Sequence, residues 1–592
     1  MLKGLEKLEY RGYDSSGICL NDGSELVVKK AKGKLEELKK LTDNGRALSG
    51  TVGIGHTRWA THGEPSDVNA HPHLSESGRF AVVHNGIIEN YLQLKEYLIS
   101  KGVTFRSMTD TEVIAQLIEF YYKGDLIDTV IKVLSRLDGS YALGVISVDD
   151  PDRIIAVRKE SPLIIGIGQG ENYIASDVPA ILAKTKRIYR LENNEIAILR
   201  RDSIKIINTD REEVKKQEET ISWTIDAAEK GGYEHFMFKE IMEQPKVIHD
   251  TISPRIRNGR VVLDEISLTP EQLRSFRKIN ILACGSAYHV GVVAKYIFEK
   301  LLRIPVEADL ASEFRYRDPI VDDKTLTIVI SQSGETADTK EAMKEAQRRG
   351  SHVISIVNVV GSAIATESDD VIYTWAGPEI AVATTKAYSA QLAVIYLMAI
   401  FFGDLLGTID EKQYGYYVSE LLTIPDKISQ ILENSTQVQY LASKLFNSKD
   451  IFFIGRNIDY ALSLEGSLKL KEISYIHSEA YAAGELKHGT ISLIENGTLV
   501  IALATHEPLI AKTVSNIREV QTRGANVLCL ACDDHKELAD VAQSTVFIPK
   551  ICDMMLPSLA VVPLQLFAYY VASAKGCDID KPRNLAKSVT VE

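Results

Sequence analysis

The chain has 592 residues, of which 45% are hydrophobic and 25% are charged, and its formal net charge at pH 7 is −12. This length exceeds what a single hydrophobic core supports, so we expect several domains joined by short connections. A negative net charge without a long basic run argues against binding to nucleic acid or to an anionic membrane surface. Small phosphorylated substrates stay compatible with this charge, because one loop can bind phosphate in an acidic protein.

Short strands outnumber helices in the N-terminal region, residues 1–210, and they come in adjacent pairs. This pattern predicts an α+β layered sheet rather than a βαβ array. A polar stretch that ends in Gly231-Gly232 follows, and we interpret residues 211–232 as a linker. The candidate strands are Thr51–Gly55, Phe80–His84, Tyr141–Val148, Arg153–Arg158 and Ile196–Leu199, and the candidate helices are Asn90–Lys101 and Thr111–Gly124.

From Ile279 onward the chain repeats a pattern of strand, glycine loop and helix, which is typical of a doubly wound α/β fold. Three landmarks recur at nearly the same offset, so we infer a duplicated α/β domain, residues 233–408 and 409–576, followed by a tail, 577–592. The matching landmarks are Ile281–Gly285 with Phe452–Gly455, Thr325–Ile330 with Thr498–Leu503, and Gln347–Gly350 with Gln521–Gly524.

The cysteines and the apolar segments indicate the cellular compartment in which the protein folds. The six cysteines are scattered, which argues against a disulfide framework and for a reducing compartment. Cys529 and Cys532 form a CxxC without the second pair that zinc needs, so we interpret them as part of a core strand. The segments Ala393–Phe402 and Leu559–Ala574 fall short of the ~20 residues that span a bilayer, and the N-terminus is too charged for a signal peptide. We read both segments as buried helices of a cytoplasmic protein.

A hydroxyl-rich loop, Ser331-Gln332-Ser333-Gly334-Glu335-Thr336, lies between an apolar strand and a helix predicted from about Ala337 to Arg349. Such a loop at a helix N-terminus is typical of an anion site, because backbone N–H groups and the helix dipole favour negative charge. The spacing and lysine of a nucleotide-binding Walker loop are missing. The alternative is that these hydroxyls only cap the helix. The second repeat argues against it, because its stretch Ala504–Pro508 lacks the serines.

Several motifs of this half resemble the sugar-isomerase (SIS) domains of the glutamine–fructose-6-phosphate aminotransferases (isomerizing), also called glucosamine-6-phosphate synthases. The resemblance implies two doubly wound SIS domains in tandem. It covers both repeats and reaches the last residue. The matching segments are Cys284-Gly285-Ser286, Ser331–Thr339, Ala383-Thr384-Thr385-Lys386, Lys469–Ser474, Glu485–Gly489 and Pro582–Glu592.

The resemblance assigns the isomerase chemistry residue by residue. It implies that Lys587 forms a Schiff base with the sugar carbonyl, that Glu472 abstracts a carbon-bound proton, and that His488 opens the sugar ring. Glu465 lies one helical turn from Lys469 on the same face. Ala287 departs from the family pattern, which usually has a serine there. The expected phosphate- and sugar-binding residues are Ser286, Ser331, Gln332, Ser333, Thr336 and Lys469.

The N-terminal third resembles the glutaminase domain of the same family, which has the fold of the N-terminal-nucleophile hydrolases. The matching runs are Arg11–Ser15, His56–Gly63, His71-Pro72-His73, His84-Asn85-Gly86 and Thr109–Glu112. By this resemblance Arg58 binds the α-carboxylate of glutamine and Asp110 its amino group, while Asn85 and the Gly86 N–H stabilise the oxyanion. The expected glutamine-binding residues are Arg58, Trp59, Thr61, His62, Asn85, Gly86 and Asp110, with Trp59 gating ammonia passage.

A metal site is the rival interpretation of the histidines in this third, which are His56, His62, His71, His73 and His84. We expect neither a metal nor another cofactor. The HxH at 71–73 contains a proline, and we expect the histidines to fall on separate loops.

The cysteine nucleophile of the family is missing from this chain. In the family it opens a buried strand as the first residue after removal of methionine, and its free amine acts as the base. This chain begins Met1-Leu2-Lys3-Gly4, and Cys19 lies in an apolar strand without a free amine. Either the start of the reading frame is set too far downstream, or the protein is shortened and uses free ammonia. We favour the first, because the other glutamine-site residues are present, and we expect no glutaminase activity from the chain as written.

The resemblance therefore implies glutamine-dependent synthesis of glucosamine 6-phosphate from fructose 6-phosphate by a homodimer. The partners are fructose 6-phosphate and glutamine, or ammonia. The alternative is an ammonia-dependent synthase, or a related amino-sugar-phosphate isomerase or deglycase without glutaminase activity. A sugar-phosphate sensor would need a DNA-binding segment, and no helix-turn-helix with a basic face is apparent.

Overall fold

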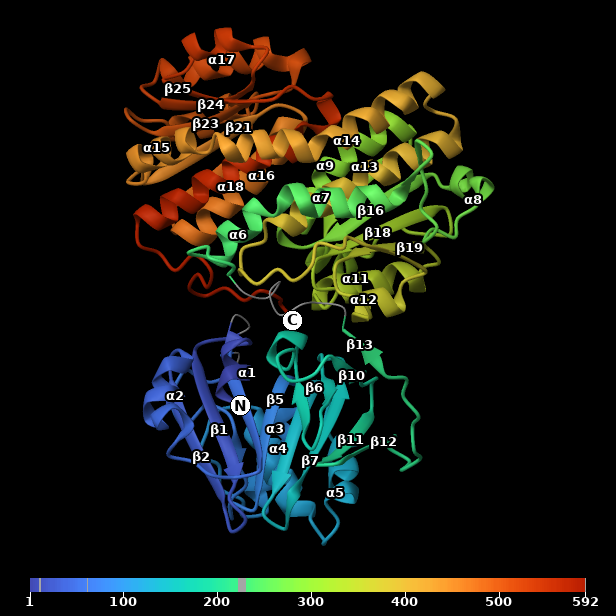
Figure 1. Cartoon of the computed structure of the whole chain (residues 1–592), viewed down its shortest axis with the longest axis vertical. Coiled ribbons are helices and arrows are strands. Elements are labelled where there is room, and N and C mark those ends of the chain that lie inside the picture. Colours follow the sequence, from blue (N-terminus) through green and yellow to red (C-terminus); the bar gives the residue numbers. More distant parts are fainter. Residues whose placement is uncertain (10–11, 61, 222–229, 591–592) are drawn as a thin grey trace. The chain divides into compact units, whose positions relative to one another are not determined.

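The computed structural model of the chain describes residues 1–9, 12–60, 62–221 and 230–590. The chain divides into two compact units. Unit 1 comprises residues 1–228 together with 588–592, and unit 2 comprises residues 229–587. Figure 1 draws the elements of both units with their labels.

Unit 1 is a stack of helices and antiparallel sheets. Its longest sheet runs in the order β12-β11-β7-β6-β5-β4, and helices α3, α4 and α5 pack on one face of it. The sheet β2-β1-β3 packs on the other face through Ile54 and Val83, and α1 and α2 cover its outer side. This is the layered α+β architecture that the paired strands predict.

The strands of unit 1 are β1 (Ser15–Asn21), β2 (Leu26–Lys32), β3 (Val52–Arg58), β4 (His73–Leu74), β5 (Phe80–Ile88), β6 (Gly139–Ser147), β7 (Asp150–Lys159), β8 (Ile164–Ile167), β9 (Asn172–Ala175), β10 (Arg187–Arg190), β11 (Glu195–Arg200), β12 (Ser203–Ile207) and β13 (Glu219–Thr220). Its helices are α1 (Leu2–Glu6), α2 (Leu35–Leu41), α3 (Tyr91–Ser100), α4 (Thr111–Tyr121) and α5 (Leu126–Leu134). The strands β13-β10-β8-β9 form a further antiparallel sheet.

The predicted elements of unit 1 are present, with ends shifted by a few residues. Helix α5 lies outside the predicted helices, although its sequence carries a capping signal. The side chain of Asp125 accepts hydrogen bonds from the N–H groups of Ile127 and Asp128, and this satisfies two donors of the first turn. The predicted linker, 211–232, falls partly outside the described residues.

Unit 2 contains the same parallel sheet twice. The first runs in the order β17-β16-β18-β19-β20 and the second in the order β22-β21-β23-β24-β25. In each sheet the strand that comes first in the chain lies between the second and the third, so both sheets follow the same doubly wound path. The duplication that the sequence landmarks predict is therefore confirmed in the topology.

The first sheet consists of β16 (Lys278–Ala283), β17 (Val306–Leu310), β18 (Thr325–Ser331), β19 (His352–Val357) and β20 (Asp370–Tyr373), and the second of β21 (Asp450–Gly455), β22 (His477–Ala482), β23 (Leu499–Ala504), β24 (Asn526–Cys532) and β25 (Ser544–Ile548). A hairpin, β14 (Ile256–Arg257) and β15 (Arg260–Val261), precedes them. The helices are α6 (Phe236–Met242), α7 (Gln244–Ile252), α8 (Pro270–Ser275), α9 (Gly285–Leu302), α10 (Ala311–Phe314), α11 (Ala337–Arg348), α12 (Ala363–Glu367), α13 (Lys386–Leu406), α14 (Glu411–Glu433), α15 (Thr436–Leu445), α16 (Ile458–Ser474), α17 (Ile510–Gln521) and α18 (Leu556–Ala574).

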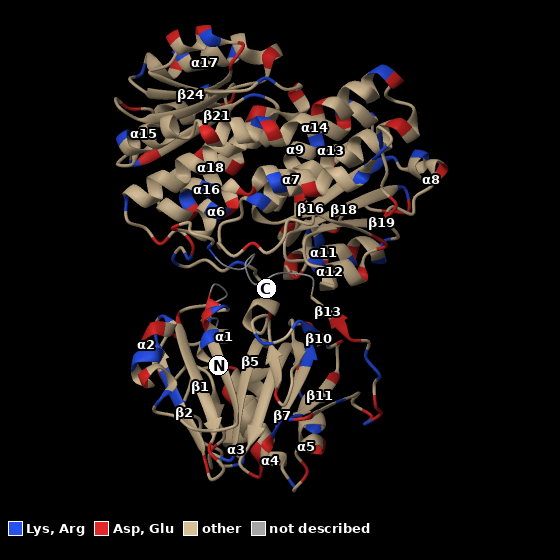
Figure 2. Ribbon diagram, in the orientation of Figure 1, with Lys and Arg blue, Asp and Glu red and all other residues tan. Residues whose placement is uncertain are grey.

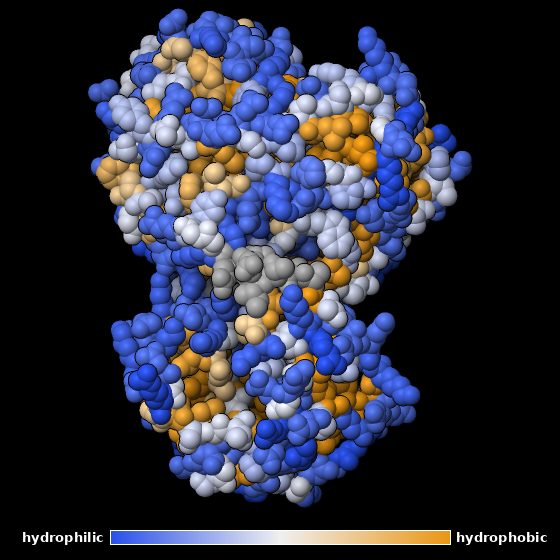
Figure 3. Space-filling view, in the orientation of Figure 1, coloured by the Kyte–Doolittle hydropathy of each residue, from blue (hydrophilic) through white to orange (hydrophobic). Residues whose placement is uncertain are grey.

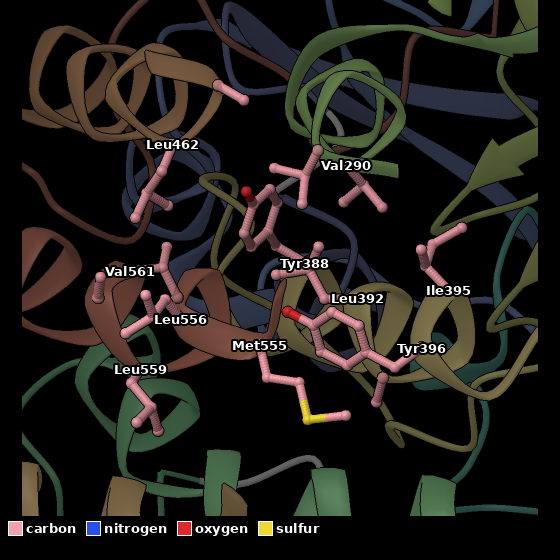
Figure 4. Close-up of a cluster of buried hydrophobic side chains, with 14 of the residues drawn as sticks. Val290, Tyr388, Leu392, Ile395, Tyr396, Leu462, Met555, Leu556, Leu559 and Val561 are labelled. Carbon is pink, nitrogen blue, oxygen red and sulfur yellow. The ribbon is translucent and has the colours of Figure 1, made fainter. Parts of the chain in front are cut away.

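One hydrophobic core joins the two halves of unit 2. Figure 4 shows Tyr388 and Leu392 of α13 packed among side chains of α9, α16 and α18. The stretches 386–406 and 553–574 are long and apolar enough to cross a membrane, but 78% and 94% of their most apolar windows are buried inside the protein. Their apolarity is explained by this core, as predicted. Cys529 and Cys532 lie buried as free thiols in β24, which confirms the core-strand interpretation.

The surface differs from this core. Positive and negative residues alternate along helices such as α2 and α17 in Figure 2, and no long stretch of one sign stands out on the drawn face. On the face drawn in Figure 3, apolar areas are interrupted by hydrophilic residues in both units.

Shortening a side chain of the shared core tests how much that side chain contributes to the stability of unit 2. Leu392→Ala should lower the free energy of unfolding by about 2–5 kcal/mol, because Leu392 is fully buried and the change leaves a cavity. Leu422→Ala is the control, since Leu422 is 47% exposed on α14. Urea unfolding followed by circular dichroism measures both, and equal midpoints for the two variants would contradict the assignment of the core.

Candidate active sites

The hydroxyl-rich loop lies where the sheet order reverses. Strands β16 and β18 are adjacent and parallel, yet their connections leave toward opposite sides, to β17 and β19. Doubly wound folds bind ligands at this point, beyond the carboxyl ends of the strands. Ser331 is the last residue of β18, and α11 begins right after Thr336. A contact of 3.8 Å between Thr339 Oγ1 and Cys284 Sγ joins the two strand ends.

Internal hydrogen bonds shape the loop around its backbone N–H groups. Ser331 Oγ accepts from Gly334 N at 3.0 Å and lies 3.0 Å from Thr336 Oγ1. Gly334 has a φ of +65°, and a Cβ there would lie 1.9 Å from Ser362 Oγ, so only glycine fits. Gln332, Ser333 and Thr336 are half-buried, which leaves them accessible to a ligand.

The equivalent loop of the second half is filled by the protein itself. The carboxylate of Asp459, on the first turn of α16, accepts hydrogen bonds from the N–H groups of Thr505 (3.0 Å) and His506 (3.2 Å) and from Thr505 Oγ1 (2.5 Å). Burial raises the pKa of Asp459, although these donors oppose the shift. The backbone N–H groups of the loop after β23 are thus already bound by an internal carboxylate.

The tail residue Lys587 forms a buried ion pair with Glu379. The Lys587 side chain is 4% exposed and that of Glu379 is fully buried. Lys587 Nζ donates to Glu379 Oε2 and, at 3.3 Å, to Thr384 Oγ1. Burial alone would raise the pKa of Glu379, but the Lys587 ammonium and the N–H groups of Thr385 and Ala387 outweigh it and lower that pKa. Glu379 was not among the expected residues, although it lies just ahead of the Ala383–Lys386 motif.

Helix α16 carries a second buried charge cluster. Lys469 Nζ contacts Glu472 Oε2 at 2.5 Å and Glu465 Oε1 at 3.6 Å, as expected for one helical face. Burial raises the pKa of Glu472, and the Lys469 ammonium limits that rise. Glu472 keeps 20% of its side chain exposed, so it is the member of this cluster that solvent or a ligand can reach.

Glu465 links this cluster to the first half of unit 2. Its Oε1 accepts from Ser286 Oγ at 2.9 Å, and its Oε2 lies 2.8 Å from His289 Nδ1. Ser286, expected at the sugar site, therefore has a carboxylate partner in the second half. The electrostatic influence of Glu379 on Lys469 and of Lys587 on Glu472 connects the two charge clusters.

His488 lies apart from these contacts. It ends the 3-10 turn Leu486–His488, its side chain is exposed, and its backbone N–H donates to Glu485 O. Among the described residues, no contact joins it to Lys587 or Glu472. Its role in ring opening stays a prediction.

In unit 1 the expected glutamine residues cluster at the ends of β3 and β5. Arg58 is buried; its Nη2 donates to the carbonyls of His62 and Gly63, while its Nη1 is buried without a partner among the described residues. Asp110 is 4% exposed and accepts from Ile88 N at 2.9 Å. An unpaired guanidinium nitrogen beside a buried carboxylate can bind the two charged groups of an amino acid.

Asn85 and Gly86, which are expected to stabilise the oxyanion, lie side by side on β5. Asn85 Oδ1 is 2.6 Å from His56 Nε2, and Gly86 has a φ of +131° with Ser140 O so close that no Cβ fits. Trp59 is half-buried, and His62 contacts the ring of Tyr91 edge-on at 5.0 Å. Thr61, also expected here, lies outside the described residues.

The expectation that the histidines fall on separate loops is wrong. His56 lies on β3, His73 on β4 and His84 on β5, and the sheets bring these strands together with His71. His56 and His71 stack at 4.3 Å, and His71 meets His73 edge-on at 5.0 Å. Threonine hydroxyls of 109 and 111 bind His73, His71 and His84. Burial lowers the pKa of all four imidazoles, that of His56 to about 4.

Comparisons with known proteins identify the types of domain in which these residues lie. Residues 272–401 and 444–575 match the SIS domain model, and residues 17–235 match a glutamine amidotransferase domain model. The glutamine–fructose-6-phosphate aminotransferase (isomerizing) of Caldanaerobacter subterraneus subsp. tengcongensis is 58% identical over 100% of this chain and 97% of its own length. Those of Clostridium tetani and Thermus thermophilus are 55% and 46% identical at the same coverage.

The chain belongs to this aminotransferase family.

Solved structures support the assignment for the isomerase half of this aminotransferase. The C-terminal domain of the glucosamine-fructose-6-phosphate aminotransferase from Francisella tularensis is similar to 60% of this chain and is covered over 99% of its length, with a TM-score of 0.58 and 36% identity. The fold is therefore a glutaminase domain of the N-terminal-nucleophile type followed by two SIS domains. The residue-level roles and the domain boundaries stay predictions.

Acid should destabilise the glutaminase domain through its histidine cluster. A histidine whose folded pKa lies below the unfolded value of about 6.5 binds fewer protons when folded, so stability falls as the pH drops from there toward about 4. Replacing His56 by Gln should weaken this dependence, because one titrating imidazole is removed and an amide donor to Asn85 is kept.

Pulse proteolysis in urea at near-neutral and mildly acidic pH measures the effect for unit 1. His477→Gln is the control, since the His477 side chain is 67% exposed. A loss of stability on acidification that is the same in His56→Gln and in the unaltered protein would exclude His56 as a contributor.

Proposed function

We propose that this aminotransferase makes glucosamine 6-phosphate from fructose 6-phosphate, with glutamine as the nitrogen donor. The relatives at 46–58% identity carry the name of that activity, and the chain contains both domain types that it requires. The observation that carries the proposal is the buried Lys587–Glu379 pair, because it holds an amine able to form an imine beside a second buried acid–base cluster.

In this proposal the phosphate group anchors the substrate in the active site. The hydroxyls of Ser331, Ser333 and Thr336 and the backbone N–H groups at the start of α11 bind the phosphate, and the helix dipole favours its charge. The side chain of Gln332 adds an amide donor to the same loop. The filled loop of the second half supports a single site per chain, since Asp459 already occupies the equivalent donors there.

The carbonyl chemistry follows from the two clusters. The neutral amine of Lys587 attacks C2 of the open-chain ketose and forms an imine with loss of water. Ammonia then displaces Lys587 from C2, which regenerates the free lysine and leaves the nitrogen on the sugar. Glu472 removes the proton from C1 and returns it at C2, so that the product is an amino-aldose. A carboxyl whose pKa is raised by burial is suited to this transfer near neutral pH.

Ammonia comes from glutamine in unit 1. Arg58 Nη1 and Asp110 bind the α-carboxylate and α-amino group, and Asn85 with the Gly86 N–H stabilises the oxyanion. Trp59 and His62 complete this set, together with Thr61. The free cysteines throughout the described chain are compatible with a reducing, cytoplasmic setting. A homodimer is part of the same proposal.

The second candidate is an ammonia-dependent synthase, and the burial of Cys19 is the observation that favours it. The family nucleophile is an N-terminal cysteine, and Cys19 cannot replace it. Cys19 is fully buried in β1, and burial raises the pKa of its thiol to about 12, so no thiolate forms at neutral pH.

Removing the lysine amine tests the isomerase proposal. Lys587→Ala should abolish formation of glucosamine 6-phosphate from fructose 6-phosphate with an ammonium salt and without glutamine. Without Lys587 there is no ammonium to pair with Glu379 and no amine to form the imine. Lys575→Ala is the matched control, because Lys575 is an exposed lysine just after α18. Near-normal turnover of Lys587→Ala would refute the Schiff-base role.

The glutaminase half has its own test. A polypeptide of these 592 residues should release no glutamate from glutamine, because burial raises the pKa of Cys19, the thiol in unit 1, to about 12 and so disfavours a thiolate nucleophile. The same polypeptide should still accept ammonia. Measured glutamate release that matches the rate of a relative with an N-terminal cysteine would contradict this expectation.

A further inference from the structure

A buried acid next to the Lys587–Glu379 pair has no part in the mechanism above. Glu240 lies on α6 with 2% of its surface exposed. Its Oε1 accepts hydrogen bonds from the backbone N–H groups of Ile380 at 2.6 Å and Ala381 at 3.1 Å. These two residues directly follow Glu379 in the chain.

Those bonds fix the segment that carries both partners of Lys587. Glu379 Oε1 accepts from the N–H groups of Thr385 (3.0 Å) and Ala387 (3.1 Å), which closes the segment 379–387 on itself. Glu240 of α6 binds this closed segment near its start, at Ile380 and Ala381. A shift of α6 or a loss of its carboxyl would therefore move Glu379 and Thr384 relative to the amine they bind.

The second carboxylate oxygen of Glu240 takes no part in these hydrogen bonds. Glu240 Oε2 is buried and has no hydrogen-bond partner among the described residues. The nearby lysines already have partners: Lys386 Nζ is 2.7 Å from Glu243 Oε2, and Lys587 pairs with Glu379. An ionised Glu240 would thus be a buried charge without a dedicated counter-charge, which is costly, whereas the protonated form is not.

We propose that Glu240 is a positioning residue for the Lys587 amine, and that it performs this role as a neutral acid. This inference rests on the proposed function. It identifies Glu240 as the group that places Glu379 and Thr384 while adding no second negative charge beside Lys587. Ionisation of Glu240 would add that charge and hold Lys587 in its ammonium form, which cannot attack a carbonyl.

The electrostatic setting of Glu240 agrees with this geometry. Burial and the neighbouring Glu379 carboxylate raise the pKa of Glu240, and Lys587, Lys386 and the Ile380 N–H oppose them, so that the pKa is about 8. The charged groups that face it or its helix are Glu379, Lys587, Lys386, Lys239, Glu243 and, at the start of α6, Asp580. Helix α18 packs on α6: its Tyr569 Oη lies 3.0 Å from His235 Nδ1 at the start of α6, and its Gln565 Oε1 accepts a hydrogen bond from Gln244 Nε2 of α7.

The measured step is imine formation, because it needs no ammonia and so does not depend on the ammonia–ammonium balance. The Lys587 amine and the C2 carbonyl give an imine and water, and a hydride from cyanoborohydride reduces the imine to a stable secondary amine. Mass spectrometry of the full chain after reaction with fructose 6-phosphate then gives the initial rate of adduct formation on Lys587 between about pH 6.5 and about pH 9.5.

Glu240→Gln keeps an oxygen for Ile380 and Ala381 but cannot ionise. Its rate should equal that of the unaltered chain within about twofold near pH 7 and exceed it by about fivefold or more near pH 9, with the divergence centred near pH 8. Glu234→Gln, which changes an exposed acid before α6, should follow the unaltered chain at every pH. A pH-independent ratio between Glu240→Gln and the unaltered chain overturns the neutral-acid role.

Glu240→Ala tests positioning. It removes the acceptor for both N–H groups, so the adduct rate should fall about tenfold or more while the half-saturating fructose 6-phosphate concentration changes little, because the phosphate loop is untouched. Recovery of that loss in Glu240→Gln separates positioning from charge. A rate for Glu240→Ala within twofold of the unaltered chain overturns the positioning role, and if Glu240→Ala does not fold, the pH profile of Glu240→Gln decides.

The unaltered chain distinguishes the two levels of the proposal. If it forms no adduct on Lys587, the proposed isomerase chemistry fails. If it forms the adduct and the Glu240 variants behave like it, only the role of Glu240 fails.

Discussion

The ammonium of Lys587 lies where little water can solvate it, and its partner Glu379 is fully buried. Moving two such charges out of water costs several kcal/mol for each ion, and their attraction compensates only if their geometry is held rigidly. The geometry here is held by backbone: Glu379 is fixed by N–H groups at the start of α13, and the same segment is tied to α6. The polar tail is therefore anchored in unit 2 by a charge pair that demands an ordered surrounding.

The hydrophobic core of unit 2 keeps the surroundings of the Lys587–Glu379 pair ordered. Helices α13 and α18 are apolar nearly all round because each is packed on several sides, and α9 and α16 complete the same cluster. Charged residues border this cluster at two helix starts and along one face of α16. Lys386 begins α13, Asp459 lies in the first turn of α16, and Glu465 and Lys469 lie farther along α16. These buried charges have polar partners, and the rest of the cluster is apolar.

Much of the fold follows from local pattern. The duplicated sheet is readable from apolar runs with glycine and polar loops at matched spacing, and the Ser331–Thr336 loop is readable as an anion site. The roles of Lys587 and Glu472 came only from resemblance, because a lysine in a polar tail has no local feature that marks it. Glu379 and Glu240 could not be predicted. Lys587 and Glu379 are 208 residues apart in the chain, and only the assembled domain brings them together.

The histidine cluster of unit 1 could not be predicted from the sequence either. They lie on or next to three different strands, β3, β4 and β5, and the sequence alone does not show that these strands are neighbours. Sheet pairing between β4 and β5, together with the packing of β3 against β5, gathers them into one buried group. Their neutral state follows from that burial and not from any feature of their sequence neighbours.

The Asp459 carboxylate makes the two halves of unit 2 unequal in how their loops are held. In the loop after β23, the N–H groups of Thr505 and His506 donate to this buried carboxylate. In the loop after β18, the N–H groups of Gly334 and Glu335 donate to hydroxyls of the loop itself, those of Ser331 and Ser333. A charged acceptor binds its donors more strongly than a neutral hydroxyl does, so the loop after β18 is the one that opens at the lower cost in free energy. Two identical copies of the domain could not provide this difference.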